Sequence, residues 1–107
     1  MCEREQEILL GFYPVMEEYR QNRARAGLSK RGISVDRCMA GQIITLWKAG
    51  IRTYGCCCGH GEYDGWINVA PQDFTKAMEL GWKQYHYEDE LDRKDTIFAK
   101  KPYPCDL

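Results

Sequence analysis

Residues 34–50 read SVDRCMAGQIITLWKAG and carry the clearest periodic pattern in the chain. Apolar side chains return there at every fourth residue, which predicts an α-helix with one apolar face. These side chains are Val35, Met39, Ile43 and Trp47. We place the start of the helix near Ser34 or Asp36, because either side chain can accept hydrogen bonds from free N–H groups. Gly50 predicts its end, since glycine readily adopts the left-handed conformation that closes helices.

Two predicted strands follow this helix and flank a run of three cysteines. Residues 51–54 form the first strand and residues 66–70 the second. The loop between them contains Cys-Cys-Cys-Gly-His-Gly at residues 56–61. Together these features predict a β-hairpin that is closed by a long, glycine-containing loop.

A similar order of elements occurs again in the second half of the chain. Pro71 suits the first turn of a helix over residues 72–80, and Gly81 predicts the end of that helix. Residues 82–87 and 96–100 are then predicted strands on either side of an acidic turn. The two helix-glycine-strand segments resemble a weak internal repeat, although any junction of this kind produces the same similarity.

The whole chain has the size and composition of one globular domain, with 107 residues of which 44% are apolar. Its first part, residues 1–27, is predicted to be helical, with a kink or a break at Pro14. Residues 34–101 form the predicted αββαββ core. We therefore predict a single α+β domain over residues 1–107, with two layers in the order α-αββ-αββ. Its helices should pack on one mainly antiparallel, four-stranded sheet.

Composition and charge exclude several functional classes. The chain opens with densely charged residues and no apolar signal segment, and no stretch approaches the ~20 apolar residues of a membrane span. We therefore expect a cytoplasmic protein without membrane contact. The net charge is −1 and no known nucleic-acid motif is present, so sequence-specific DNA reading is not predicted.

Cysteine usage favours a metal site over disulfides. Three of the six cysteines are consecutive, and neighbouring cysteines can pair with each other only through a strained geometry. The helix near residue 38 and the strand after it each span about 20 Å, so the chain should return to the end at which the helix began. Cys38 is therefore expected beside the cysteine run and His60.

We predict a zinc site with the ligands Cys38, Cys57, Cys58 and His60, because structural zinc commonly takes thiolates with a histidine in a tetrahedron. Cys56 can replace one of the two loop cysteines, since consecutive side chains point in different directions and the sequence does not choose between them. In the alternative interpretation, Cys38 is a small buried apolar residue and His60 is an ordinary loop histidine.

The same end of the domain can serve two other purposes. Backbone N–H groups near Gly59 and Gly61, together with the side chain of Arg37, would form a pocket for a small anionic or nucleotide ligand. A loop cysteine with a lowered pKa could instead act as a nucleophile, with His60 shuttling protons. No known thiol-enzyme signature follows the cysteine run, so binding ranks ahead of catalysis.

Several stretches of this chain resemble small proteins of bacterial genomes and their phages that carry a Cys-Cys-Gly-His-Gly loop. The stretches are residues 36–46, 50–53, 57–61 and 78–82. The resemblance brings no established activity, but it implies a cytoplasmic protein of phage or mobile-element origin in which Cys38 and the loop form one site. We expect a small zinc-stabilised accessory domain that binds a protein partner or a small anionic or nucleotide ligand. The alternative is a small thiol-dependent enzyme.

Overall fold

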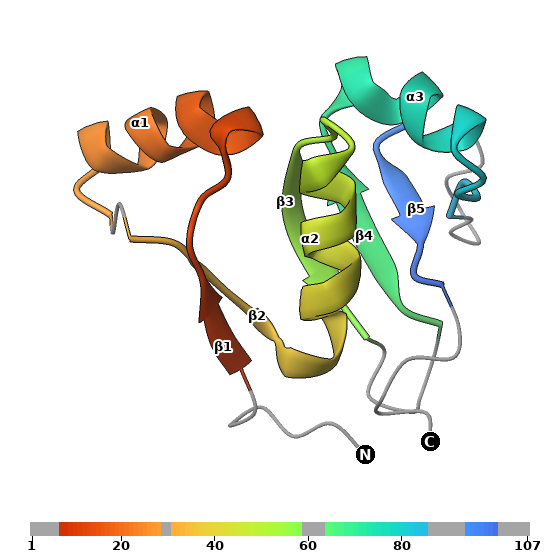
Figure 1. Cartoon of the computed structure of the whole chain (residues 1–107), viewed down its shortest axis with the longest axis horizontal. Helices are drawn as coiled ribbons and strands as arrows, with labels where there is room; N and C mark the ends of the chain where they lie inside the picture. The colour runs from red at the N-terminus through yellow and green to blue at the C-terminus, as the bar shows by residue number, and fades with distance from the viewer. Residues whose placement is uncertain (1–6, 29–30, 59–63, 86–93, 101–107) are drawn as a thin grey trace.

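The computed structural model describes residues 7–28, 31–58, 64–85 and 94–100. Its α-helices are α1 (Glu17–Arg25), α2 (Ala40–Lys48) and α3 (Phe74–Glu79). Its strands are β1 (Glu7–Leu10), β2 (Ile33–Asp36), β3 (Thr53–Cys57), β4 (Trp66–Val69) and β5 (Thr96–Phe98). A 3-10 turn leads into each α-helix, at Pro14–Met16, Arg37–Met39 and Pro71–Asp73. Figure 1 shows these elements with α1 above β1 and β2, and α2 in front of β3 and β4.

The described strands form two antiparallel sheets, so the predicted single four-stranded sheet is wrong. β1 pairs with β2, and β3, β4 and β5 pair in that order. β2 and β3 are in contact, yet no ladder joins them in the described part of the chain. They run in the same direction, and α2 forms the crossover between them (Figure 1). The coarser expectation of an α+β protein with antiparallel sheets is confirmed.

The N-terminal part departs most from the prediction, because its first half is strand β1 and not helix. β1 pairs antiparallel with β2, with Leu10 opposite Ile33. A Cβ atom at Gly32 would lie 2.0 Å from the carbonyl oxygen of Leu10, so only glycine allows this approach. Helical structure begins only at Pro14, whose fixed φ suits the first turn.

The central helix begins later than predicted. Residues Ile33–Asp36 form β2, and Arg37–Met39 form a 3-10 turn. The four-residue spacing of apolar side chains before Ala40 therefore does not mark a helix. No side-chain cap hydrogen bond is found at either start, so neither Ser34 nor Asp36 acts as the expected cap. The end is as predicted, because Gly50 has a φ of 82°.

The hairpin of β3 and β4 is confirmed, but its first strand is Thr53–Cys57 and not residues 51–54, so Cys56 and Cys57 belong to the strand and not to the loop. The hairpin also contains an irregularity that the sequence did not reveal. Thr53 lies opposite Val69 and Gly55 lies opposite Asn68, so Tyr54 is an extra residue in β3. Such a β-bulge bends the strand and redirects its side chains. The bulge therefore lies just before the cysteine run.

The last helix is also confirmed, with Gly81 at its end in the left-handed region at a φ of 94°. The strand predicted over residues 82–87 is reduced in the described part to a single bridge between Gln84 and Ile97 of β5. Residues 86–93, which include the end of that predicted strand and most of the predicted acidic turn, lie outside the described residues.

Each of the three helices belongs to the same local unit of strand, 3-10 turn, helix and glycine. The glycines are Gly27, Gly50 and Gly81, with φ angles of 76°, 82° and 94°. After each glycine, the next N–H donates to a carbonyl five residues earlier, from Leu28 to Arg23, Ile51 to Leu46 and Trp82 to Ala77, at 2.8, 2.9 and 3.1 Å. The sequence indicated this repeat only for the second and third units.

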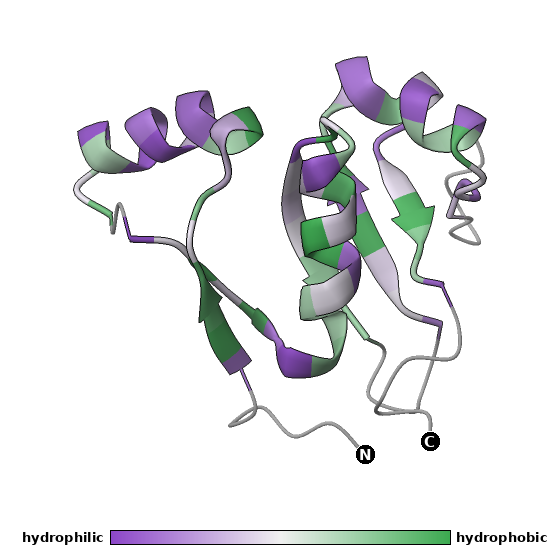
Figure 2. Cartoon of the chain, viewed as in Figure 1, coloured by the Kyte–Doolittle hydropathy of each residue, from purple (hydrophilic) through white to green (hydrophobic). Residues whose placement is uncertain are grey.

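One apolar core connects the two sheets. Its most deeply buried members come from the turns before α1 and α2, from α2 and from the three-stranded sheet, and include Met16, Met39, Leu46, Ile67 and Ile97. Hydrophobic residues of α2 and of the strands behind it appear together in Figure 2. Among the described residues, none of the helices has the length and apolar character that crossing a bilayer requires.

Candidate functional site

The cysteine run lies at the end of β3, close to the turn that leads from β2 into α2. Cys56 and Cys57 are the last residues of β3 and are half-buried, whereas the following Cys58 is fully buried. Cys38 lies in the 3-10 turn before α2 and is 9% exposed. These four cysteines form no disulfide in the described part of the chain.

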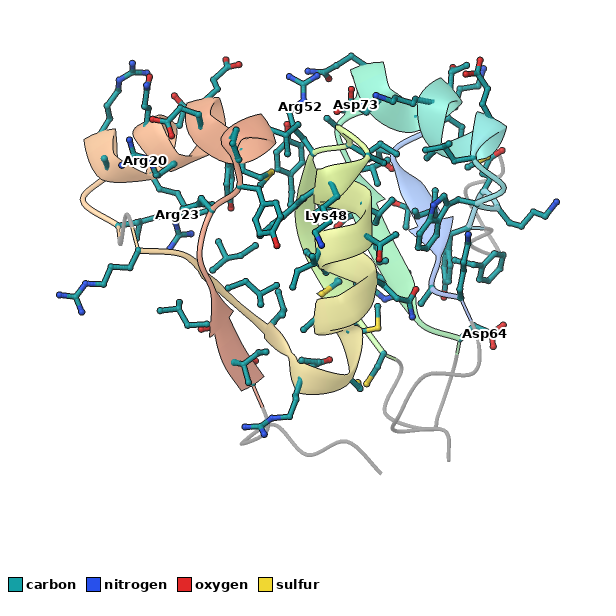
Figure 3. The ribbon with its side chains drawn as sticks, viewed as in Figure 1. Arg20, Arg23, Lys48, Arg52, Asp64 and Asp73 are labelled. Atoms are coloured by element: carbon teal, nitrogen blue, oxygen red, sulfur yellow. The ribbon has the colours of Figure 1, made fainter. Side chains whose placement is uncertain are left out.

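Asp36 connects the two segments. Its carboxylate accepts a long hydrogen bond from the N–H of Cys58, at 3.4 Å. The backbone of Asp36 is also hydrogen-bonded to the Cys56 thiol. Since Asp36 precedes Cys38 by only two residues, the chain folds back so that both segments lie at the same end of the molecule. Sulfur atoms are visible around this end of α2 in Figure 3.

Cys56 is poorly suited to nucleophilic chemistry. Burial raises the pKa of Cys56 to about 12, and the negative charge of Asp36 adds to the effect. A thiol with such a pKa is protonated near neutral pH, whereas the thiolate is the nucleophile. This raised pKa argues against Cys56 as the nucleophile of the thiol-dependent enzyme considered from the sequence.

Only some of the predicted zinc ligands are among the described residues. His60, Gly59 and Gly61 lie outside the described residues. Within residues 7–28, 31–58, 64–85 and 94–100, no three cysteine, histidine, aspartate or glutamate side chains come together in a group that could hold a metal ion. Cys38, Cys57 and Cys58 therefore do not form a coordination group by themselves in the described part of the chain.

Arg37, the predicted contact for an anionic ligand, is exposed at the first position of the turn before α2. The two glycines expected to complete that pocket are among the residues that are not described. This part of the ligand prediction therefore stays a prediction.

A cavity that the sequence did not reveal lies between β2 and β3 and has a volume of about 350 Å³. Its lining comes from four elements and includes Tyr19 and Arg23 of α1, Val35 of β2, Ile43 of α2, and Tyr54 and Cys56 of β3. The cavity exists because the edges of β2 and β3 are not paired with each other. The cavity could be predicted only from strands β1 and β2. The sequence pattern instead predicted helix for β1 and for most of β2.

Tyr19 and Tyr54 separate this cavity from a second one of about 240 Å³. Their ring centroids are 5.3 Å apart and the ring planes are tilted by 46°. The second cavity reaches Arg52, whose guanidinium is held by Asp73 at 2.8 and 3.1 Å. Figure 3 shows Arg52 and Asp73 together near the start of α3.

No protein-family model, no curated protein and no solved structure matches this chain. The resemblance to phage-associated proteins with a Cys-Cys-Gly-His-Gly loop therefore stays a prediction.

Proposed function

We propose that this protein is a small zinc-stabilised accessory domain that binds a protein partner or a small anionic or nucleotide ligand. Its zinc ligands would be Cys38, Cys57, Cys58 and His60. The observation that carries the proposal is the contact of Asp36 with Cys56 and Cys58, because it joins the turn of Cys38 to the cysteine run. No described residue pattern favours catalysis in its place.

The chemistry of the cysteines supports a structural role for the ion. Thiols are weak ligands until they lose their protons, and zinc binding drives that loss, so folding of the loop and binding of the ion are coupled. Cys58 is fully buried and Cys38 nearly so, which shields these two sulfurs from solvent. The described cysteines do not form a finished group by themselves, so the proposed site also needs His60, which lies outside the described residues.

A binding role also agrees with the shape of the molecule. The cavity between β2 and β3 opens beside the same strand that carries the cysteines, and Cys56 is part of its lining. A zinc ion at the end of β3 would fix the position of that strand, and with it one wall of the cavity. The ion would thus support a binding surface and would not need to contact the ligand.

Elemental analysis of the protein, purified without added metal, tests the zinc site. We expect about one zinc per chain, and a loss of most of it in Cys38→Ser and in His60→Ala, because each substitution removes one of the four protein ligands of a structural site. Cys105→Ser is the matched control, since it removes a thiol that the sequence does not assign to the site, and it should keep the zinc.

The proposal fails if the unmodified protein contains no zinc and takes up none from a stoichiometric solution at neutral pH. It fails equally if zinc is bound but its amount is the same in Cys38→Ser as in Cys105→Ser. Far-UV circular dichroism of each variant shows whether a loss of metal merely follows a loss of fold.

A further inference from the structure

The cavity between β2 and β3 has the features of a specific ligand site. We propose that it binds a nucleoside monophosphate, with the phosphate at Arg23 and the base against Tyr54. The proposal rests on the proposed function, because it gives the place and the chemical class of the ligand that the domain would bind. The groups that would contact the ligand come from α1, β2 and β3, and none of the four proposed zinc ligands is among the described residues that line the cavity.

The facing edges of β2 and β3 border the cavity. β2 pairs with β1 on one side and β3 pairs with β4 on one side, but no ladder joins β2 to β3 in the described chain. A strand edge beside a cavity can offer N–H and C=O groups to a ligand. The exocyclic amino, carbonyl and ring nitrogen groups of a base are suitable partners, because they offer donors and acceptors in one plane.

The cavity is closed at one end, which favours a small ligand over an extended peptide. At the end of the two strands, Asp36 meets Cys56 and Cys58 and draws β2 and β3 together. Ile43 of α2 contributes to the lining and is almost fully buried. A peptide strand that added to either edge would have to run past this closed end, whereas a compact molecule would not. The volume of about 350 Å³ also falls within the range for small-molecule sites.

The charge of the lining selects an anion. Arg23 lines the cavity, and none of the described residues that line it is acidic. The guanidinium of Arg23 lies 5.9 Å from the centre of the Tyr19 ring, and Figure 3 shows the side chain on the side of α1 that faces the strands. A guanidinium binds phosphate oxygens through paired hydrogen bonds. Asp36 lies at the closed end, so a phosphate is favoured at Arg23 and not there.

The aromatic lining selects a planar group next to that anion. Tyr54 is 42% exposed although it belongs to a strand, because it is the extra residue of the bulge. It contacts Tyr19, and both rings line the cavity. Bases stack on tyrosine rings with little dependence on their identity. A nucleotide would contact both Arg23 and Tyr54, whereas inorganic phosphate would contact Arg23 alone. The site should therefore bind a nucleotide more tightly than inorganic phosphate.

Calorimetric titration of the full-length protein with AMP, GMP, CMP and UMP tests the proposal. We expect saturable binding of at least one of them at one site per chain. Arg23→Gln should weaken it at least about tenfold, since a hydrogen-bonded charge pair is lost. Arg25→Gln is the matched control on the same helix, because Arg25 hydrogen-bonds Asn22 and does not line the cavity.

The aromatic contact is tested with Tyr54→Ala and Tyr54→Phe. The first should weaken nucleotide binding about tenfold, and the second should preserve it because the ring remains. Thermal unfolding and zinc content are measured for every variant. An unchanged zinc content beside weakened nucleotide binding shows that the two sites are separate, so failure of one proposal is distinguishable from failure of the other.

Three results would overturn the proposal: no saturable binding of any of the four nucleotides, equal affinity for inorganic phosphate, or equal effects of Arg23→Gln and Arg25→Gln. If a substitution lowers the unfolding temperature, the site is tested instead with the unmodified protein. The changes in its amide chemical shifts are then measured by NMR upon addition of the tightest-binding nucleotide. Shifts centred on β2 and β3 support the site, and shifts centred elsewhere refute it.

Discussion

Asp73 is a nearly buried carboxylate that accepts three hydrogen bonds from one residue. The donors are the backbone N–H and two guanidinium nitrogens of Arg52, at 3.0, 2.8 and 3.1 Å. Arg52 therefore holds the pKa of Asp73 below its ordinary value. The contact ties the start of α3 to the segment between α2 and β3, and it fixes a wall of the smaller cavity.

This contact predicts a loss of stability in acid. Because the folded-state pKa of Asp73 is lowered, its contribution is fully present above the unfolded-state pKa of about 4 and disappears as the pH falls through the folded-state pKa. Asp73→Asn should lower the free energy of unfolding by about 2 kcal/mol at pH 7, and by less below pH 4. Urea unfolding at pH 7 and pH 3 measures both. Exposed Glu79→Gln is the control, and an equal loss at the two pH values would contradict the prediction.

A second residue-scale prediction concerns the indole of Trp47, whose N–H donates to the hydroxyl of Thr53 at 2.9 Å in a buried setting. Thr53→Val keeps the side-chain shape but leaves the indole N–H unsatisfied, so it should cost about 1–3 kcal/mol. In the background of Trp47→Phe, the same substitution should cost much less. A double-mutant cycle by chemical unfolding measures the coupling, and strict additivity would show that the hydrogen bond contributes nothing.

At the scale of elements, a glycine that ends a helix and a glycine inside a helix should respond in opposite ways to substitution by alanine. Gly81 has a φ of 94° with open space around a Cβ atom, so Gly81→Ala should destabilise by about 1 kcal/mol through backbone strain alone. Gly41 lies within α2, also with open space, so Gly41→Ala should stabilise by roughly 0.5–1 kcal/mol. Thermal unfolding compares the two, and shifts of the same sign would contradict the assignment.

The elements that the sequence predicted well are those whose limits are set by local chemistry. Gly50 and Gly81 end their helices, and Pro71 begins a turn, because φ preferences act within a few residues. β1 was missed because Ile8, Leu9 and Phe12 recur at three- and four-residue steps, as in a helix. Only pairing with β2 resolves that ambiguity, and pairing partners are distant in sequence.

The candidate site was predictable to a similar extent. The fold-back that brings the turn of Cys38 near the cysteine run follows from element lengths, and it was anticipated even though the start of the helix was wrong. The bulge at Tyr54 and the cavity beside β2 were not anticipated. Both depend on strand register, which apolar and polar patterns do not specify at the level of one residue.

At the scale of the whole molecule, one core serves both sheets, which predicts a single cooperative unfolding transition. Met16 is fully buried in the turn before α1, and Tyr13 beside it lies 5.6 Å from the ring of Trp47 in α2. Met16→Ala should lower the free energy of unfolding by about 2–4 kcal/mol. Because the core is shared, it should shift the transition as a whole. Far-UV circular dichroism and tryptophan fluorescence should give coincident curves, and separate midpoints would show that the two sheets unfold independently.

The extra residue in β3 can be lost without disturbing the cysteines. Residues that lie directly opposite each other in an antiparallel pair share a face, so Cys56 and Cys57 keep the faces of their partners Ile67 and Trp66 whether or not Tyr54 is inserted. A relative that lacks the insertion would keep the cysteine run in place and would lose the exposed tyrosine beside the cavity. Conservation of the cysteine run therefore does not imply conservation of the cavity.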